Sequence, residues 1–277
     1  MGIITKLFGR SGGDPPPPTR DVGALVSPFC RPAVRLVKSA AQSRSYLGGT
    51  PPLPAGTAWP ARGADALAFL ACIDLESLRM TSAMPWLPPS GRLLFFYDTE
   101  KQPWGFDPRD RGGWAVLHTI DLSTSPVRPS PTPPLPRHGV SFESITSFPS
   151  WERPEVSALQ LTDAEADTLI DMKSAVYRNG PCHQVDGFPN PIQGDDMELE
   201  CQLVSNGLYC GNSSGYESAE AAALRGGASE WRLLLQVDSD DDLKVMWGDG
   251  GVLYFWIREA DARAGRFDNA WVVLQCF

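Results

Sequence analysis

Two stretches of the chain share a pattern of apolar strand, turn and second apolar strand. In residues 231–257, WRLLLQVDSDDDLKVMWGDGGVLYFWI, two apolar runs flank an acidic turn and a glycine-rich turn. Residues 67–97 begin with LAFLACIDLESL and, after a loop, end with GRLLFFY. Continuous apolar runs of this length are typical of strands that are buried on both faces. The pattern therefore predicts a β-rich core organised around two hairpin-like pieces.

The rest of the chain predicts further strands and several short helices. The expected strands are 114–120, 140–145 at a sheet edge, 198–209 and 270–277. The expected helices are 31–41, 162–178 and 217–224. The helix over 162–178 has the clearest start, because Thr162 can cap it and Glu165, three residues later, completes a capping box. The expected fold class is thus α+β, with a largely antiparallel sheet and a few flanking helices.

Four short segments recur in the same order in residues 45–120 and 183–277. The pairs are GTP at 49–51 with GFP at 187–189, FLACID at 69–74 with LLLQVD at 233–238, GRLLFF at 91–96 with GVLYFW at 251–256, and WAVL at 114–117 with WVVL at 271–274. Such repetition predicts two related β-rich halves, each burying its apolar face against the other. A proline-rich connector, 121–136, and the helix at 162–178 would join the halves into one domain over 21–277.

Composition and charge narrow the class of protein. With 42% apolar and 21% charged residues, the chain has the composition of an ordinary soluble globular protein. Its 33 acidic residues outnumber the 24 basic ones, for a net charge of -9. This balance disfavours nucleic-acid binding, which depends on clustered Lys and Arg. The sequence has no apolar run long enough to span a bilayer and no signal peptide, so we expect a cytoplasmic protein.

The N-terminal residues and the cysteines have ordinary structural interpretations. Residues 1–20 predict a short amphipathic helix and then a proline-rich linker, SGGDPPPPTR. That helix could touch a membrane or a partner, but a frayed helix, or one docked on its own domain, is favoured because ten residues are too few for firm anchoring. The six cysteines include no CxxC pair. We therefore expect reduced, mostly buried thiols instead of disulfides or zinc ligands.

The repeated segments and the loops next to them carry a set of motifs between Ser45 and Phe277. They are Gly48-Gly49 with Pro51, Pro54 and Trp59-Pro60; Ile73-Asp74; Leu87-Pro88 with Gly91, Leu93, Phe95 and Phe96; Gly187, Pro189 and Gln193; Leu233, Leu235, Gln236, Val237 and Asp238; and Trp247-Gly248-Asp249 and Gly251 with Phe255. This set resembles the YwqG-like family, also called the DUF1963 domain. The resemblance implies a mixed α+β fold with a central, largely antiparallel sheet in a soluble, mostly bacterial protein, and it implies no established activity. One departure is Cys72, which stands where the second half has Gln236.

The acidic residues supply the candidates for catalysis and metal binding. Asp74 and Asp238 end equivalent strands and could act as a paired acid and base, whereas capping of a turn N–H is the competing interpretation. Asp240, Asp241 and Asp242 form a run that could bind a divalent cation. Its spacing is not that of an EF-hand, and a solvated turn that protects a strand edge is expected instead. The sequence contains no zinc-hydrolase, nucleotide-binding or nucleophile-elbow motif, and it predicts no cofactor.

Loop residues and motif residues supply the candidates for ligand binding. Trp59 and Trp247 lie in loops rich in proline and glycine, where they could line a groove or cover the edge of the core. Gln193, Gln236 and Asp249 belong to the motifs shared with the resembling family and are further binding candidates.

Two classes of function are compatible with these patterns. The first hypothesis is a non-enzymatic binding or protein-interaction module, whose acidic surface and aromatic loops would suit a partner protein such as a toxin, or a small ligand. The alternative is a carboxylate-dependent hydrolase or transferase, with or without a divalent metal ion, whose site lies between the two halves. The sequence specifies neither the ligand or partner nor the oligomeric state.

Overall fold

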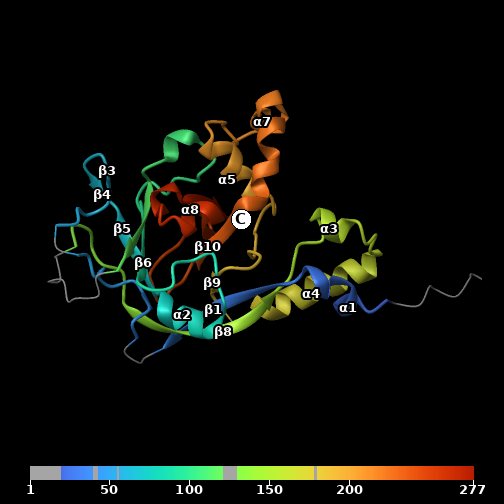
Figure 1. Ribbon diagram of the computed structural model, residues 1–277, viewed down its shortest axis with the longest axis horizontal. Coiled ribbons are helices and arrows are strands. Elements are labelled where there is room, and N and C mark those ends of the chain that lie inside the picture. The colour runs from blue at the N-terminus through green and yellow to red at the C-terminus, as the bar shows by residue number, and fades with distance from the viewer. Residues whose placement is uncertain (1–19, 40–42, 55, 121–129, 178–179) are drawn as a thin grey trace, which may run out of the picture.

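A ten-stranded sheet forms the centre of the protein (Figure 1). The computed structural model describes residues 20–39, 43–54, 56–120, 130–177 and 180–277. The strands lie in the order β12-β11-β10-β9-β1-β8-β2-β5-β6-β7, and every neighbouring pair is antiparallel. The expected α+β class with a largely antiparallel sheet is therefore confirmed.

The elements follow one another along the chain with short connections. The strands of the large sheet are β1 (Arg31–Ser39), β2 (Tyr46–Leu47), β5 (Ala68–Asp74), β6 (Arg92–Tyr97), β7 (Trp114–Thr119), β8 (His138–Ser147), β9 (His183–Val185), β10 (Trp231–Asp238), β11 (Val252–Arg258) and β12 (Trp271–Gln275). A separate small ribbon is made of β3 (Ala61–Arg62) and β4 (Asp65–Ala66). The α-helices are α1 (Val22–Val26), α2 (Leu75–Thr81), α3 (Pro154–Ser157), α4 (Asp163–Tyr177), α5 (Met197–Ser205), α6 (Ser214–Glu217), α7 (Ala219–Leu224) and α8 (Glu259–Arg263). Four 3-10 helices are η1 (Ser27–Phe29), η2 (Pro108–Asp110), η3 (Arg225–Glu230) and η4 (Phe267–Asn269).

Elements with strong patterns lie where the sequence predicts them. Strand β5 is buried at all seven positions, and β6, β7, β10, β11 and β12 also coincide with predicted apolar runs. Helix α4 begins with the predicted capping box. The Thr162 N–H donates to Glu165 Oε2 (2.9 Å), and the Glu165 N–H donates to Thr162 Oγ1 (3.4 Å).

Two predicted elements are wrong, and one correctly predicted strand is misplaced in the sheet. The segment predicted as a helix over 31–41 forms strand β1, which pairs with β8 on one side and β9 on the other; two ladders of backbone hydrogen bonds outweigh a weak helical stripe. The segment predicted as a strand over 198–209 forms helix α5, which buries Met197, Cys201 and Val204 at helical spacing. The residues at 140–145 belong to β8, which lies between β1 and β2 and is not an edge strand.

The strand order is nearly mirrored about the centre of the sheet. Outward from β8 the strands are β2, β5, β6 and β7, and outward from β1 they are β9, β10, β11 and β12. The pairing of β5 with β6 shifts register between Phe69 and Ala71, and the pairing of β10 with β11 shifts between Leu233 and Leu235. These positions match in the alignment of the two predicted halves. Matching strand order and matching bulges support the internal repeat, which stays a prediction.

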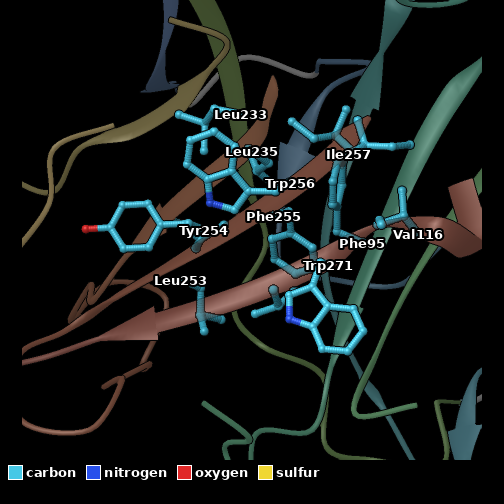
Figure 2. Close-up of a cluster of buried hydrophobic side chains, with 14 of the residues drawn as sticks. Phe95, Val116, Leu233, Leu235, Leu253, Tyr254, Phe255, Trp256, Ile257 and Trp271 are labelled. Atoms are coloured by element: carbon cyan, nitrogen blue, oxygen red, sulfur yellow. The ribbon is translucent and has the colours of Figure 1, made fainter. Parts of the chain in front are cut away.

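The strands β2, β5, β6 and β7 form one wing of the curved sheet, and β9, β10, β11 and β12 form the other. Aromatic side chains fill the space between these two wings. Phe95 of β6 packs against Phe255 of β11, with ring centroids 5.2 Å apart, and Figure 2 shows this pair within the main apolar cluster. Tyr97 packs in the same edge-on way against Trp247, at 5.6 Å. Because these rings are buried, the two wings share one hydrophobic core.

The two edge strands of the sheet, β7 and β12, meet through a pair of tryptophans. The rings of Trp114 and Trp271 lie 4.9 Å apart, and each indole N–H donates across the gap, Trp114 to the Ala270 carbonyl (2.9 Å) and Trp271 to the Gly105 carbonyl (2.8 Å). Gly105 approaches β12 so closely that a Cβ there would lie 1.7 Å from the Val272 carbonyl oxygen. The sheet is therefore curved almost into a closed barrel.

Helices α1, α3 and α4 form a separate lobe at one end of the molecule (Figure 1). Val22, Val26, Val156 and Leu169 make a small hydrophobic core of their own in this helical lobe. The long strands β1 and β8, which pair from Arg31–Ser147 to Ser39–Gly139, connect the lobe to the sheet. The short helix and linker expected at 1–20 lie almost wholly outside the described residues. Within the described part of the chain, no helix combines the length and apolar character needed to cross a bilayer.

Candidate functional site

A hollow on the described part of the protein lies between the helical lobe and the sheet. It has a volume of about 670 Å³ and is called here the Arg31 cavity. Its walls come from Arg31 at the start of β1, from residues 152–155 at the start of α3, and from parts of 194–199 and 225–232. Four separate parts of the sequence therefore build it.

Arg31 is a half-buried cation with no direct charged partner. Its guanidinium lies over the ring of Phe188, 4.1 Å from the centroid. Within the described residues this guanidinium makes no hydrogen bond or ion pair, although the Arg31 carbonyl accepts from Ser147 Oγ (2.9 Å). Burial lowers the pKa of Arg31, and the nearby positive charge of Arg153 adds to this effect, although an arginine keeps its charge in proteins.

Arg153 lies beside the same ring but is fully paired. Its guanidinium is 4.5 Å from the Phe188 centroid. It donates to Asp195 (2.7 and 2.9 Å) and to Glu198 (2.9 and 3.1 Å). Burial opposes its charge, but the two carboxylates outweigh that penalty and raise the pKa of Arg153. Two neighbouring arginines thus differ: one is neutralised by protein carboxylates and the other is not.

Phe188 is held rigidly by its own segment. Its N–H donates to Ser147 Oγ (2.8 Å), and its carbonyl accepts from Gln184 Nε2 (2.8 Å). The preceding Gly187 has a φ of +75°, and a Cβ there would lie 2.7 Å from the Ala33 Cβ. Gly187 is therefore needed to place the ring under Arg31.

Two buried glutamines fix the rest of that segment, up to the cavity wall. Gln236 accepts from the Asn190 N–H (2.9 Å) and donates to the Cys182 carbonyl (2.9 Å). Gln275 accepts from the N–H groups of Ile192 (3.0 Å) and Gln193 (3.1 Å), and its Nε2 donates to the Gly194 carbonyl (2.8 Å). Both glutamines are fully buried. These contacts give Gln236, a predicted binding residue, a clear structural role.

The other predicted binding residues are spread over the fold. Gln193 lines a second cavity of about 300 Å³, beside the first, and donates to the Cys276 carbonyl (2.9 Å). Trp59 donates to the Leu67 carbonyl (2.8 Å) and packs on Phe96, so it covers an edge of the core. Trp247 is buried among core aromatics, and Asp249 is exposed. The structure does not bring these residues together, and a binding role for each stays a prediction.

The two candidate catalytic acids have different partners. Asp74 is completely buried and caps α2: it accepts from the Ser77 N–H (3.0 Å) and lies 2.9 Å from Arg44. Asp238 accepts from the Cys182 N–H (2.8 Å), and burial raises its pKa. Neither lines the Arg31 cavity. Asp74 thus makes a local capping hydrogen bond, whereas Asp238 accepts from a residue that is distant in the sequence.

The acidic run beyond β10 contains one buried member. Asp240 accepts from His183 Nε2 (3.0 Å) and from Lys38 (2.8 Å). Burial opposes the charge of Asp240, but these two donors outweigh it and hold the pKa well below its usual range. The sequence reasoning missed this buried pair with His183. Asp241 and Asp242 are exposed, and the described residues include no group of three His, Cys, Asp or Glu side chains arranged to hold a metal ion.

Sequence reasoning also missed the residues that define the cavity. Arg31 lies in a segment predicted as a helix, and Arg153 lies in a loop without a recognisable motif. Phe188 had a signal, because it stands between the motif residues Gly187 and Pro189. The thiols are as expected: all six cysteines are free, and five of them are buried.

Comparison with known protein families identifies a family model that matches this chain. The family model described as "Domain of unknown function (DUF1963)" matches residues 45–276, which is well over half of the chain and agrees with the resemblance of the motifs. No curated protein matches the chain.

Proposed function

The chain belongs to the DUF1963 family, described as a domain of unknown function, and from that premise we propose that it is a non-enzymatic binding protein. Its ligand, either a small molecule or a short segment of a partner protein, would occupy the Arg31 cavity. The observation that carries the proposal is the cavity itself, which is large enough for such a ligand at about 670 Å³.

The walls of the cavity support this proposal because they are fixed in advance. The segment that carries Phe188 is tied to strands β8, β9, β10 and β12 by the side chains of Ser147, Gln184, Gln236 and Gln275. A site whose shape is set before binding loses less conformational entropy when the ligand enters. A purely structural gap would not need such a rigid wall.

The alternative, a hydrolase or transferase between the two halves, has less support. The interior between the halves is filled by aromatic pairs such as Phe95 with Phe255 and Tyr97 with Trp247, and the two hollows that residues of both halves line contain neither Asp74 nor Asp238. Asp74 and Asp238 are engaged in separate hydrogen bonds. The binding interpretation therefore stands first.

A variant that fills the cavity tests the proposed function. Gly226 lines the cavity, and a Cβ added there meets no atom within 4 Å, so Gly226→Trp should fold and occupy the space. We expect ligands that raise the Tm of the wild-type protein in a metabolite and peptide screen to lose this effect in Gly226→Trp. Ala83→Trp, at an exposed loop position outside the cavity, is the matched control and should respond like the wild type. Ligands that stabilise all three proteins equally would contradict the proposal.

A further inference from the structure

We propose that the Arg31 cavity binds an anionic group, a carboxylate or a phosphate, through the unpaired guanidinium of Arg31. The inference rests on the proposed function and adds the chemical class of the ligand. It names Arg31 as the group that recognises this ligand.

The arginines that line the cavity differ in how their charge is satisfied. Arg153 is held by two carboxylates, as described above. Arg232 pairs with Glu259 at 2.9 Å, and Arg225 donates to the Tyr216 carbonyl (2.8 Å). Arg31 has no such acceptor among the described residues. Arg31 lines the cavity, and its guanidinium carries five N–H donors that an entering ligand could use.

Burying a charge without a partner is unfavourable, and a folded protein rarely keeps one without a reason. Arg153 and Arg232 both act to disfavour the charge on Arg31, while Glu198 and Glu155 act in the opposite sense from a distance. An anion that enters the cavity would supply the missing partner for the positive charge of Arg31. The largest gain would come from two parallel hydrogen bonds to the guanidinium, which carboxylates and phosphates can both accept.

The orientation of the guanidinium is already set. The central carbon of the guanidinium lies 4.1 Å from the centroid of the Phe188 ring, and Phe188 is fixed by Ser147 and Gln184. Stacking on an aromatic ring holds the plane of the fork, so fewer rotamers are lost on binding. A lysine at this position would supply the charge without this geometry.

The rim of the cavity limits the size of the anion. Glu152 and Asp196 line it and are exposed, and their charges would repel a long polyanion that extended past the entrance. The site therefore suits a small ligand, or the end of a chain, with one or two anionic groups.

The test is a titration of the full chain with two probes, inorganic phosphate and the dicarboxylate glutarate, followed by calorimetry and by thermal shift. We expect at least one probe to bind the wild type and to bind Arg31→Met about tenfold or more weakly, as for loss of a hydrogen bond to a charged group. Arg79→Met removes the same charge at an exposed position on α2 and should leave the affinity unchanged. A response to phosphate alone or to glutarate alone identifies which anion the site prefers.

A second readout separates recognition from a structural role. Because Arg31 is an unpaired, half-buried charge, Arg31→Met should melt at or above the wild-type temperature without ligand. A clear fall in Tm would overturn the inference, since it would make stacking on Phe188 the purpose of Arg31. If Arg31→Met does not fold, Arg31→Lys replaces it, and we expect at least about threefold weaker binding from loss of the fork. Binding by Arg31→Lys at the wild-type level would also overturn the inference.

The cavity-filling variant keeps the two proposals distinguishable. If neither probe binds the wild type, or if both bind it and Arg31→Met equally, the anion inference fails. The proposed function survives that result if Gly226→Trp still abolishes binding of ligands found in the screen. It fails only if ligand binding is insensitive to Gly226→Trp.

Discussion

The ring of Phe95 meets the ring of Phe255 edge-on, with centroids 5.2 Å apart and planes inclined at 77°. The two residues occupy matching positions in the predicted halves, one on β6 and the other on β11. Each is flanked by strands on both sides, since Phe95 lies opposite Ala71 and Val116. The core contact between the wings of the sheet is thus made by equivalent residues.

This contact predicts non-additive effects on stability. We expect Phe95→Leu and Phe255→Leu each to lower the free energy of unfolding by about 1–3 kcal/mol. The double variant should lose less than the sum, by about 0.5–1.5 kcal/mol, because the ring pair can be lost only once. Urea denaturation of the four proteins measures this coupling. Phe69→Leu belongs to a separate cluster of buried residues, so it should combine additively with Phe255→Leu.

Cys72 stands in the first predicted half where the second half has Gln236, so substitutions at these two positions should lower stability by different amounts. Gln236→Met would leave the N–H of Asn190 and the carbonyl of Cys182 without their partner, and we expect a loss of about 2–3 kcal/mol. Cys72→Ala, at the matching position of the first half, removes one sulfur atom and should lose about 1 kcal/mol. Chemical denaturation compares the two. Equal losses would mean that the glutamine does not hold the segment 186–194.

The two candidate catalytic acids should differ in their contribution to stability. Asp74→Asn removes a fully buried charge that lies 2.9 Å from Arg44, and we expect a loss of about 2–3 kcal/mol. Asp238→Asn should change stability by less than about 1 kcal/mol, since burial already disfavours the charge of Asp238 and an amide oxygen can still accept from Cys182. If the protein instead turned over a substrate that folded Asp238→Asn could not, the enzymatic alternative would replace the binding proposal.

Glu200 predicts a specific dependence of stability on pH. Burial raises the pKa of this carboxyl from 4.5 to about 7, and its Oε2 has no hydrogen-bond partner. The native state therefore keeps a proton that the unfolded state releases. Stability from this group is present below pH 4.5, is lost as the pH rises towards 7, and is constant above that value, for a total of at most about 3 kcal/mol.

Replacement by Gln removes this dependence. We expect Glu200→Gln to gain stability relative to the wild type between pH 5 and pH 8, as measured by urea denaturation at both values. The amide oxygen can still accept from the Tyr216 hydroxyl, which lies 3.3 Å from Glu200. Glu220→Gln, on the exposed face of α7, is the control and should follow the wild-type profile. Parallel profiles for all three proteins would contradict the assignment.

The sequence predicts those strands that are apolar on both faces, because short, continuous apolar runs between turn signals, such as β5, are typical of buried strands. It fails for β1, where Val34, Leu36 and Val37 also fit one face of a helix. The partners that decide the matter, β8 and β9, lie more than a hundred residues further on. In α5 the alternation of Leu199, Cys201 and Leu203 is genuine, but the helix buries the set spaced by four and three residues.

The candidate site is even less accessible to sequence reasoning. Arg31, Arg153 and Phe188 come from three separate segments, and only the folded chain places two guanidinium groups at one ring. Whether Arg31 has a partner depends on its surroundings in the folded protein, and no sequence pattern indicates this. By contrast, the capping role of Asp74 involves only neighbouring residues, because its carboxylate accepts from the N–H of Ser77, three residues later. The sequence does predict this role.

The way the edge strands meet has a consequence for how copies of this protein behave towards each other. An open sheet offers unpaired backbone groups at its last strands, and these recruit strands from other molecules into aggregates. Here the Leu274 N–H on β12 donates to the Trp104 carbonyl (3.0 Å), and Gly105 lies against the same strand with a φ of +84°. The segment that contains Trp104 and Gly105 thus covers the β12 edge of the sheet, where a strand from another molecule could otherwise pair. A single glycine that keeps this cover in place protects the protein from intermolecular strand exchange as well as from unfolding.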